Sequence, residues 1–351
     1  MNIDFHYGVV YAVARLAGLD QQRAQIVAHS CQYVDDASTS GILDFSGGES
    51  FERFASAHEM LDYGNNSRNV ENRVIWAPFH FLPGGEGKTL EEKAVCRPNS
   101  QIAQEMMAKA IEGHAAENGL HRLGISLHVY VDTWAHQGFS GIISKTNEVS
   151  SLTGDDYSHE TWLEKLKIKL ASEFIDVMSG LGHGAALHFP DMPWARWQYT
   201  NGNGALIERD NLPDFIEAAD MACRAIQGYI KGDRNYQSEP GLTDASKESL
   251  RALLGSIRDH DEKIRLQVLS KAVKAGELLG IQEDIPVYVA KGEGSWKHEA
   301  TGIVEVGDGP EPPEWSQAFE DSNYRKFHDA IKEHRFVVTQ KILPKHGLRL
   351  A

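Results

Sequence analysis

The sequence between positions 127 and 136 reads Leu127-His128-Val129-Tyr130-Val131-Asp132-Thr133-Trp134-Ala135-His136 and holds three potential metal ligands spaced four residues apart. An α-helix would bring these three side chains into an arc of roughly 80° on one face. Two imidazoles and a carboxylate are costly to bury unless something satisfies them, and a divalent metal ion does so directly. The stretch therefore predicts a buried helix that forms part of a metal site. A core network in which His and Asp satisfy one another is the alternative.

The composition is that of a globular protein with a large core. The 351 residues are 41% hydrophobic and 24% charged, which suits one large domain or two smaller ones. No window approaches the run of about 18 apolar residues that a membrane span needs. No basic region followed by an apolar core opens the sequence, so we expect no secretory signal and a cytoplasmic location, with secretion by a signal-independent route left open. Three widely spaced cysteines fit buried free thiols: Cys31, Cys96 and Cys223.

Charge and motifs narrow the function classes. A net charge of −15 excludes broad binding to duplex nucleic acid, because contacts with phosphates need clustered Lys and Arg. A phosphorylated substrate remains possible, since bound cations would locally reverse the sign of an acidic site. The Gly-x-Ser-x-Gly, phosphate-loop and His-Glu-x-x-His motifs are absent. His260-Asp261 and His328-Asp329 are adjacent pairs of the kind that HD metal phosphohydrolases use, but each lies in a strongly charged segment expected to be an exposed helix.

Helical periodicity dominates the rest of the chain. Besides the ligand-bearing helix, helices are expected over residues 7–17, 20–37, 49–63, 100–117, 161–179, 213–230, 246–279 (one or two) and 316–343. Residues 182–204 read as a Gly-, Pro- and Trp-rich loop, and residues 287–289 and 303–306 as short strands of an appended hairpin. We therefore predict an all-α metal-binding domain over residues 1–285. Residues 286–351 would add a β hairpin and a C-terminal helix, packed on the same domain.

Further His and Asp residues stand at the ends of the expected helices and in the loops between them. They are Asp4 and His6 before the first helix, Asp35 and Asp36 on the second, His80 in Trp76-Ala77-Pro78-Phe79-His80-Phe81, and His183, His188 and Asp191 in the glycine-rich loop. Because metal sites draw their ligands from several elements, these residues are candidates to complete the site that residues 128–136 begin.

In their order along the chain these residues resemble the superfamily of zinc-dependent phospholipases C and fungal single-strand nucleases. The resemblance covers roughly residues 1 to 200, and the chain also looks like an uncharacterised bacterial branch with the same Asp-Phe-His-Tyr start and Gly-His-Gly loop. It implies an all-α domain that holds three zinc ions. The implied ligands are His6, Asp35, His80, His128, Asp132, His136, and either His183 or His188 together with Asp191.

The chain departs from the superfamily pattern in three places. Secreted members use the N-terminal amine and first residue of the mature protein as ligands, whereas here a third metal site is expected to use Asp4 or to be absent. His136 follows Asp132 by four residues instead of six. Two residues separate His188 from Asp191, and His183 stands eight positions before it, so neither has the usual three-residue gap.

The sequence thus favours a metal-dependent hydrolase of phosphoric esters with two or three zinc ions, Mn²⁺ or another divalent metal being possible. Asp132 would bridge two metals, and Asp36 or Asp4 would accept a proton. The substrate could be a phosphoester small molecule, a lipid headgroup or a single-stranded nucleic acid. A phospholipase should expose an apolar rim, and a single-strand nuclease should place aromatic and basic residues beside the metals. A non-catalytic metal-binding or toxin-associated interaction protein is the alternative from another class.

Overall fold

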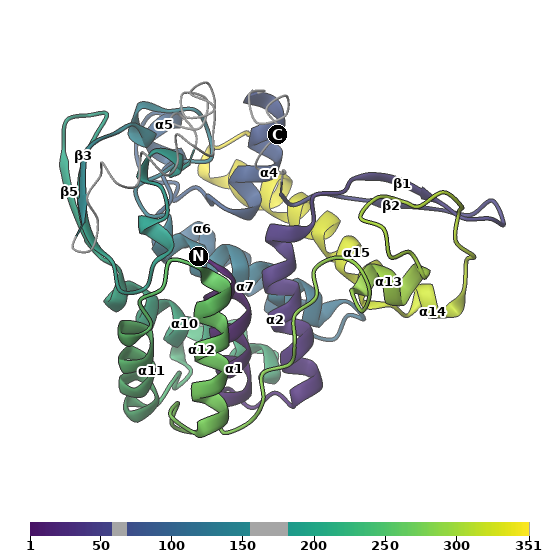
Figure 1. The fold of residues 1–351 in the computed structure, drawn as a ribbon. Helices are drawn as coiled ribbons and strands as arrows, with labels where there is room; N and C mark the ends of the chain where they lie inside the picture. The colour runs from purple at the N-terminus through teal and green to yellow at the C-terminus, as the bar shows by residue number, and fades with distance from the viewer. Residues whose placement is uncertain (58–68, 155–181, 351) are drawn as a thin grey trace.

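The computed structural model describes residues 1–57, 69–154 and 182–350, and this part of the chain is mostly helical (Figure 1). At its centre is α7 (Gly119–Ala135), the helix that carries the three ligand candidates. Every residue of α7 is buried except Leu120 and Arg122, as expected for a helix that other elements surround. The helices packed around it are α2 (Gln21–Asp36), α6 (Gln101–Glu112), α10 (Asn211–Lys231) and α15 (Asn323–Phe336).

Local signals explain where several helices begin. The side chains of Asp20 and Ser100 accept hydrogen bonds from the backbone of the first turns of α2 and α6, which is the usual role of these residue types at a helix start. Gly124 lets α2 and α7 approach closely, because a Cβ there would lie 2.4 Å from the carbonyl oxygen of Val27. The strong contact between α2 and α7 matters for the site, since both helices carry candidate ligands.

The N-terminal residues are deeply buried. A π-helical turn, η1 (Asp4–Val9), leads into α1 (Val10–Leu16), and all six residues of η1 are buried. Two later helices, α11 (Asp244–Ser256) and α12 (Glu262–Ala275), complete this side of the molecule. In Figure 1 the N-terminus lies near the upper ends of α1 and α12. The second half of the chain therefore encloses the first residues.

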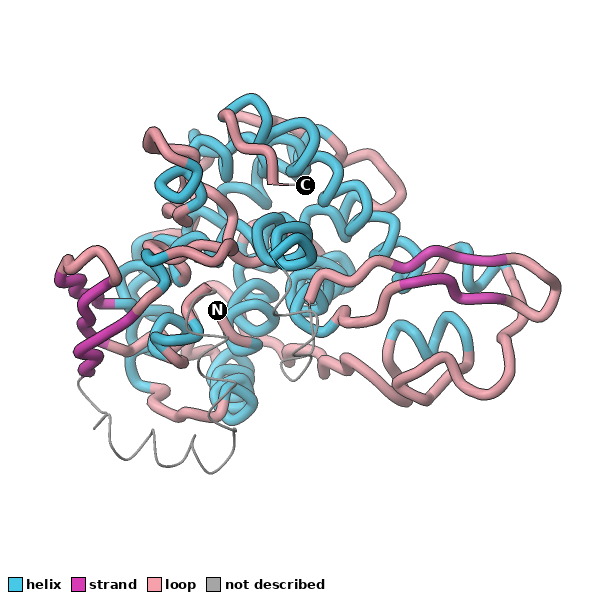
Figure 2. The backbone as a smooth tube through the Cα atoms, turned by 90° about the horizontal axis from the view of Figure 1, so that it is seen from above, coloured by secondary structure: helices cyan, strands magenta, loops and turns pink. Residues whose placement is uncertain are grey.

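Two small antiparallel sheets interrupt the helical pattern at opposite ends of the molecule (Figure 2). One pairs β1 (Gly41–Asp44) with β2 (Ser50–Arg53), and the other has the order β3 (Val149–Gly154), β4 (Arg196–Asn201), β5 (Leu206–Asp210). The expected helix over 49–63 is thus wrong over 49–57, its remainder lies outside the described residues, and β4 lies in the segment predicted to be only loop. Pairing with another strand decided both segments, and helical periodicity does not show such pairing.

The hairpin expected over 287–289 and 303–306 is wrong, since neither segment is a strand. Residues 287–289 do alternate sides, with Val287 83% exposed and the Tyr288 ring against the rings of Tyr7 and His29. No strand in the described part of the chain pairs with them, and α13 (Trp296–Thr301) follows. Side-chain docking onto η1 and α2 thus holds this stretch.

The predicted last helix divides into α14 (Gln317–Glu320), α15, η6 (Val337–Ile342) and η7 (Leu343–His346), because Ser322 caps a new helix start. Trp296 and Phe327 of this C-terminal part contact the ring of Tyr33 on α2. Residues after 285 therefore pack on the same core as the ligand-bearing helices. The remaining short elements are α4 (Asn69–Phe79), α5 (Leu90–Ala94), η2 (Lys145–Asn147), η3 (Gly184–Ala186), η4 (Phe189–Asp191) and η5 (Tyr236–Ser238).

Two further sequence predictions can be compared with the structure, and a third cannot. Cys31, Cys96 and Cys223 are free and buried, as expected. No helix among the described residues has the length and apolar content that crossing a bilayer requires. The helix expected over 161–179 lies outside the described residues.

Candidate metal centre

The ligand-bearing face of α7 lies at the centre of a buried cluster of His and Asp side chains. His128, Asp132 and His136 have relative exposures of 0%, 1% and 4%. His136 is the residue that ends α7, so the four-residue spacing brings all three to one side of the helix. The residues that join them from other elements are His6 on η1, Asp35 on α2, His80 after α4, and His183 and Asp191 in the segment before β4.

Four imidazole rings of the cluster are each anchored by a backbone carbonyl. The pairs are His128 Nδ1 with Cys31 O at 2.8 Å, His136 Nδ1 with His80 O at 2.7 Å, His183 Nδ1 with Leu187 O at 3.1 Å, and His80 Nε2 with Ser56 O at 2.9 Å. A carbonyl oxygen only accepts, so these ring nitrogens donate, and the other nitrogen of each neutral ring carries a lone pair. That second nitrogen faces the inside of the cluster in all four residues. Metal-binding histidines are held in the same way.

Asp35, His80 and His128 form the first group. The inward nitrogens, His80 Nδ1 and His128 Nε2, lie 3.3 Å apart, and each lies 3.6 Å from Asp35 Oδ1. Both rings already donate their proton to the backbone, so two lone pairs and a carboxylate oxygen meet without a hydrogen to share. A cation between these three atoms would satisfy them together.

His136, His183 and Asp191 form the second group. His136 Nε2 lies 3.5 Å from Asp191 Oδ1, and His183 Nε2 lies 3.5 Å from Asp191 Oδ2. All three potential ligand atoms lie within 4.8 Å of one another. Two neutral nitrogens and a carboxylate are a usual donor set for zinc, so this group is a second candidate cation site.

Asp132 lies between the two groups. Its Oδ2 is 3.4 Å from His128 Nε2 and 3.6 Å from the His136 ring. Its Oδ1 is 3.1 Å from His6 Nε2 and 2.6 Å from the α-amino nitrogen of Met1. The His136 atom that Asp132 approaches is Nδ1, the donor to His80 O, so only the contact with His128 is to an inward nitrogen. The bridging role of Asp132 therefore stays a prediction.

The α-amino nitrogen of Met1 belongs to the same cluster. It also lies 3.1 Å from Asp191 Oδ1, so it joins Asp132 and His6 in a third group of potential ligands. Burial lowers the pKa of this amine, but the charges of Asp132 and Asp191 raise it more, to about 11. The amine is therefore an ammonium between two buried carboxylates, at a position that attracts positive charge.

The electrostatics of the cluster suit metal ligands. Burial lowers the pKa of His80 and of His183 to about 4, so both rings are neutral at neutral pH. Burial opposes ionisation of Asp132, yet the charge of the Met1 amine holds its pKa well below the usual range. Neutral imidazoles and ionised carboxylates are the protonation states in which these side chains bind metal ions.

Cys31 is the thiol nearest to the cluster. Its Sγ lies 3.6 Å from His6 Nδ1. Burial, together with the charges of Asp132 and Asp35, raises the pKa of this thiol well above its usual value. The thiol is therefore protonated, and its geometric role is to contact the His6 ring from the side that faces away from Asp132.

A cavity of about 570 Å³ opens beside the cluster. Its wall includes Asp35, His80, Asp132, His136, His183 and Asp191. Gln32, Ser38 and Trp76, which are near these candidates in sequence, also line it, together with Met1, Phe81, Glu262 and Lys291 among others. The cluster is thus accessible to a small molecule.

The model of the family of unknown function DUF6765 matches residues 1–342. The chain belongs to this family. Searches of curated proteins and of solved structures find no match. The family description names no activity, so the chemistry of the DUF6765 cluster has to be inferred from its geometry.

Asp4 of this DUF6765 chain does not join the cluster, contrary to its expected role as a ligand or proton acceptor. Its two oxygens accept hydrogen bonds of 3.0 Å and 2.8 Å from the guanidinium of Arg265 on α12, and both side chains are buried. The Met1 amine, and not Asp4, lies beside Asp132 and Asp191. Asp4 instead fixes the N-terminal turn against the second half of the chain.

Of the two histidines in the glycine-rich loop, the structure brings His183 to Asp191 and leaves His188 out. The cause is a chain reversal between η3 and η4, where Leu187 has a φ of 63°. The reversal returns Asp191 to the His183 ring although eight positions separate them. His188 is exposed and belongs to none of the candidate groups found among the described residues.

Asp36 lines the cavity, with its Oδ2 accepting hydrogen bonds from Tyr288 at 2.6 Å and from Gln32 at 3.2 Å. It is therefore fixed in place beside Asp35, and its role as proton acceptor stays a prediction. Nothing in the sequence pattern pointed to Gln32 or Lys291, whose side chains complete the cavity wall.

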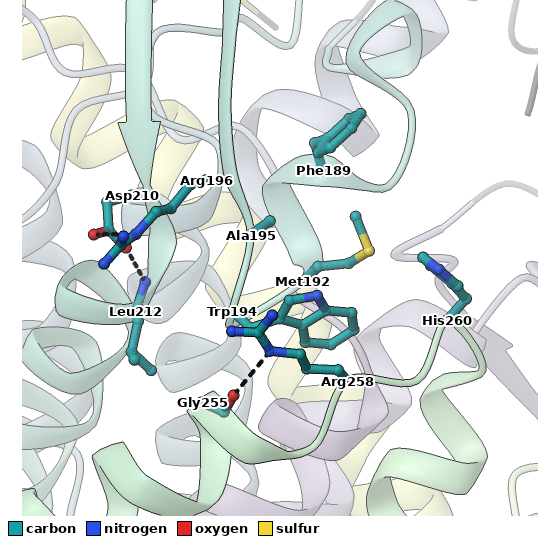
Figure 3. A pocket seen from close by; sticks show the side chains of 10 residues that line it. All are labelled: Phe189, Met192, Trp194, Ala195, Arg196, Asp210, Leu212, Gly255, Arg258 and His260. Carbon is teal, nitrogen blue, oxygen red and sulfur yellow. Dashed lines mark hydrogen bonds and ion pairs between the residues drawn. The ribbon is translucent and has the colours of Figure 1, made fainter. Parts of the chain in front are cut away.

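The adjacent His-Asp pairs have structural roles. Asp261 caps α12 by accepting from Lys263 N, and His260 lines a separate cavity of about 160 Å³ with Trp194 and Arg258 (Figure 3). The His328 Nδ1 atom lies 3.2 Å from Phe54 O. Neither pair belongs to a candidate metal group in the described parts of the chain, so the geometry does not favour the HD alternative.

Proposed function

We propose that this chain is a metal-dependent hydrolase of phosphoric esters, with two or three divalent ions, zinc foremost, in a helical fold of the phospholipase C and nuclease type. The observation that carries the proposal is the orientation of four imidazoles. Each donates one N–H to a backbone carbonyl and turns its other nitrogen toward Asp35, Asp132 or Asp191 at the wall of one cavity. A core network of mutually satisfied residues would not leave these nitrogens without protons.

The residues fit a metal cluster in a second respect. His6 Nε2 and Asp191 Oδ1 are buried atoms without a hydrogen bond, although Asp132 Oδ1 lies 3.1 Å from the first and the Met1 amine 3.1 Å from the second. Buried polar atoms normally make hydrogen bonds, so a cation would complete their surroundings. The resemblance implies that His6 and Asp132 are both metal ligands, and their Nε2 and Oδ1 atoms lie 3.1 Å apart.

Divalent ions held here would neutralise phosphoryl oxygens and lower the pKa of a water molecule toward neutrality. Residues of the chain would hold these ions and accept the proton that the water molecule loses. Asp132, whose Oδ2 lies near His128 and His136 and whose Oδ1 lies near His6, would help to hold the ions together. Asp36, held by Tyr288 and Gln32, would accept a proton at Oδ1, the oxygen that these two residues leave free of their hydrogen bonds. The cavity beside the ligands favours catalysis over a closed structural metal site.

The purified protein should contain at least two divalent metal ions per chain, because the first and second groups together offer six ligand atoms and one tetrahedral ion uses four. Mass spectrometry for metals after dialysis measures the number. Fewer than one ion per chain, with no uptake when zinc is added, would contradict the proposal and leave the non-catalytic alternative.

The metal-loaded protein should hydrolyse bis-p-nitrophenyl phosphate, since the cluster acts on the phosphoryl group and a good leaving group makes few demands on the pocket. EDTA or phenanthroline should stop the release of p-nitrophenol, and zinc or manganese should restore it. Release of p-nitrophenol that survives chelation, or that equals the rate of an Asp132→Asn control, would argue against a metal-dependent hydrolase.

A further inference from the structure

Cys31 on α2 contacts two of the candidate ligands through different atoms. Its carbonyl oxygen accepts the hydrogen bond from His128 Nδ1 at 2.8 Å, and its Sγ lies 3.6 Å from His6 Nδ1. The two imidazole rings stack on each other, with their centres 4.0 Å apart and an angle of 21° between their planes. All three residues have relative exposures of 0%. One residue of α2 therefore lies against both rings of a buried stack.

His6 differs from the four imidazoles that backbone carbonyls anchor. In the described part of the chain no carbonyl oxygen accepts a hydrogen bond from the His6 ring, and the atom beside its Nδ1 is the Cys31 sulfur. Burial lowers the pKa of His6, so the ring is neutral and has one ring proton. The position of that proton decides which nitrogen can bind a cation.

The contacts of the two ring nitrogens indicate where this proton lies. His6 Nε2 is buried and makes no hydrogen bond, although Asp132 Oδ1 is 3.1 Å away. A proton on Nε2 would therefore lack an acceptor in line with it. A proton on Nδ1 has the Cys31 sulfur beside it, and sulfur is a weak acceptor. The contacts favour a ring that is protonated at Nδ1 and has its lone pair at Nε2, toward Asp132.

The backbone around Cys31 is packed closely against α7. A Cβ at Gly124 would lie 2.5 Å from Ser30 Cβ and 3.1 Å from the backbone nitrogen of Cys31. His128 follows Gly124 by four residues, so both face the same turns of α2. The thiol is therefore presented to the His6 ring by a part of α2 that has little room to move.

We propose that Cys31 is a positioning residue of the metal centre, whose sulfur accepts the Nδ1 proton of His6 and keeps the Nε2 lone pair directed at the cation site beside Asp132. This inference rests on the metal cluster of the proposed function. The sulfur would do for His6 what backbone carbonyls do for the other four rings. The thiol keeps its own proton, because burial and the charges of Asp132 and Asp35 raise its pKa well above the usual value.

Zinc affinity tests this role in two pairs of matched variants. Cys31→Ala removes the acceptor, and Cys31→Ser replaces it with a hydroxyl oxygen. Cys223→Ala and Cys223→Ser are the controls, since Cys223 is a free thiol on α10 with 1% exposure that belongs to no candidate metal group among the described residues. Competition with a zinc chelator measures affinity, and urea unfolding of the metal-free proteins measures the loss of packing.

We expect Cys31→Ala to bind zinc at least about tenfold more weakly than Cys223→Ala, which is the lower end of the cost of removing a group that orients a metal ligand. Cys31→Ser should bind zinc more tightly than Cys31→Ala, because its hydroxyl also accepts a hydrogen bond. Equal zinc affinities of Cys31→Ala and Cys223→Ala would overturn the positioning role.

Cobalt spectra distinguish a positioning thiol from a thiol that binds the metal. Cobalt-loaded wild type should lack the near-ultraviolet band of a cobalt–thiolate bond, since only a deprotonated sulfur is a metal ligand. The visible bands of cobalt should change in Cys31→Ala and stay the same in Cys223→Ala. A thiolate band that Cys31→Ala removes would overturn the proposal, because Cys31 would then be a ligand itself.

The location of the ring proton is a readout that needs neither metal nor turnover. Nitrogen-15 spectra of labelled histidine in the metal-free protein distinguish a ring nitrogen with a proton from one without, and loss of a signal in His6→Gln assigns it. His6 should be protonated at Nδ1 in wild type and in Cys223→Ala, and no longer at Nδ1 alone in Cys31→Ala. A wild-type His6 ring protonated at Nε2 would contradict the proposal.

The two proposals fail in different ways. If zinc-loaded wild type hydrolyses no phosphoester, the hydrolase proposal fails, and zinc affinity still decides the role of Cys31. If wild type binds no metal ion, the location of the His6 ring proton decides it. If wild type hydrolyses phosphoesters and Cys31→Ala equals Cys223→Ala in zinc affinity, the hydrolase proposal stands and the positioning role fails.

Discussion

Replacing Asp132 with asparagine should remove phosphoester hydrolysis while the helix content stays unchanged. Asn has the shape of Asp but lacks the charge, and Asp132 is the carboxylate whose oxygens face His128, His136, His6 and the Met1 amine. Residues that only support a metal ligand already cost up to about a hundredfold when they are replaced, so a bridging ligand should cost more. Initial rates with bis-p-nitrophenyl phosphate and far-ultraviolet circular dichroism measure the two effects.

A pair of variants in the glycine-rich loop controls this experiment. His183→Ala should lose metal and activity, because its ring faces Asp191, whereas His188→Ala should keep both, because its side chain is exposed. The two substitutions are the same in chemistry and lie five positions apart. Full activity in Asp132→Asn, or equal effects of the two His variants, would show that the site is assigned to the wrong residues.

Replacing Arg265 with methionine should destabilise the protein by about 3–5 kcal/mol, because it leaves the Asp4 carboxylate buried without its partner. Arg265 also donates to the carbonyl oxygens of Asp259 and His260, and its guanidinium lies 5.5 Å from the centre of the Trp194 ring. Urea unfolding measures the loss. Because the N-terminal turn would be released, affinity for zinc should fall as well.

The pH dependence of this loss gives an independent check. Burial raises the pKa of Asp4, and Arg265 opposes that rise. Without Arg265, the carboxyl should protonate more readily, so the difference in stability from wild type should shrink as the pH falls. The double variant Asp4→Leu with Arg265→Met should recover at least half of the loss, since it leaves no buried charge unpaired. A single variant as stable as wild type would show that the ion pair does not hold the N-terminus in place.

Local sequence determined the helical framework and the spacing of the central residues. Helix geometry alone places His128, Asp132 and His136 on one face of α7, whatever packs against it. The helix starts expected at residues 20 and 100 agree with the caps of α2 and α6, because capping depends on the next three residues. The order of His and Asp residues along the chain predicted further members of the cluster, and the fold brings most of them together. Their role as metal ligands stays a prediction.

Only the tertiary structure decided which of the remaining candidates meet. Asp4 lies outside the cluster because it pairs with Arg265, 261 positions later in the chain. His183 replaced His188 because the backbone reverses at Leu187. Lys291 lines the cavity because its segment packs at the end of α2, where Tyr288 bonds to Asp36 and Lys291 to Ser38. β4 pairs with β3, which lies more than forty residues earlier. These outcomes depend on contacts between residues distant in sequence, whose energies no local spacing or propensity contains.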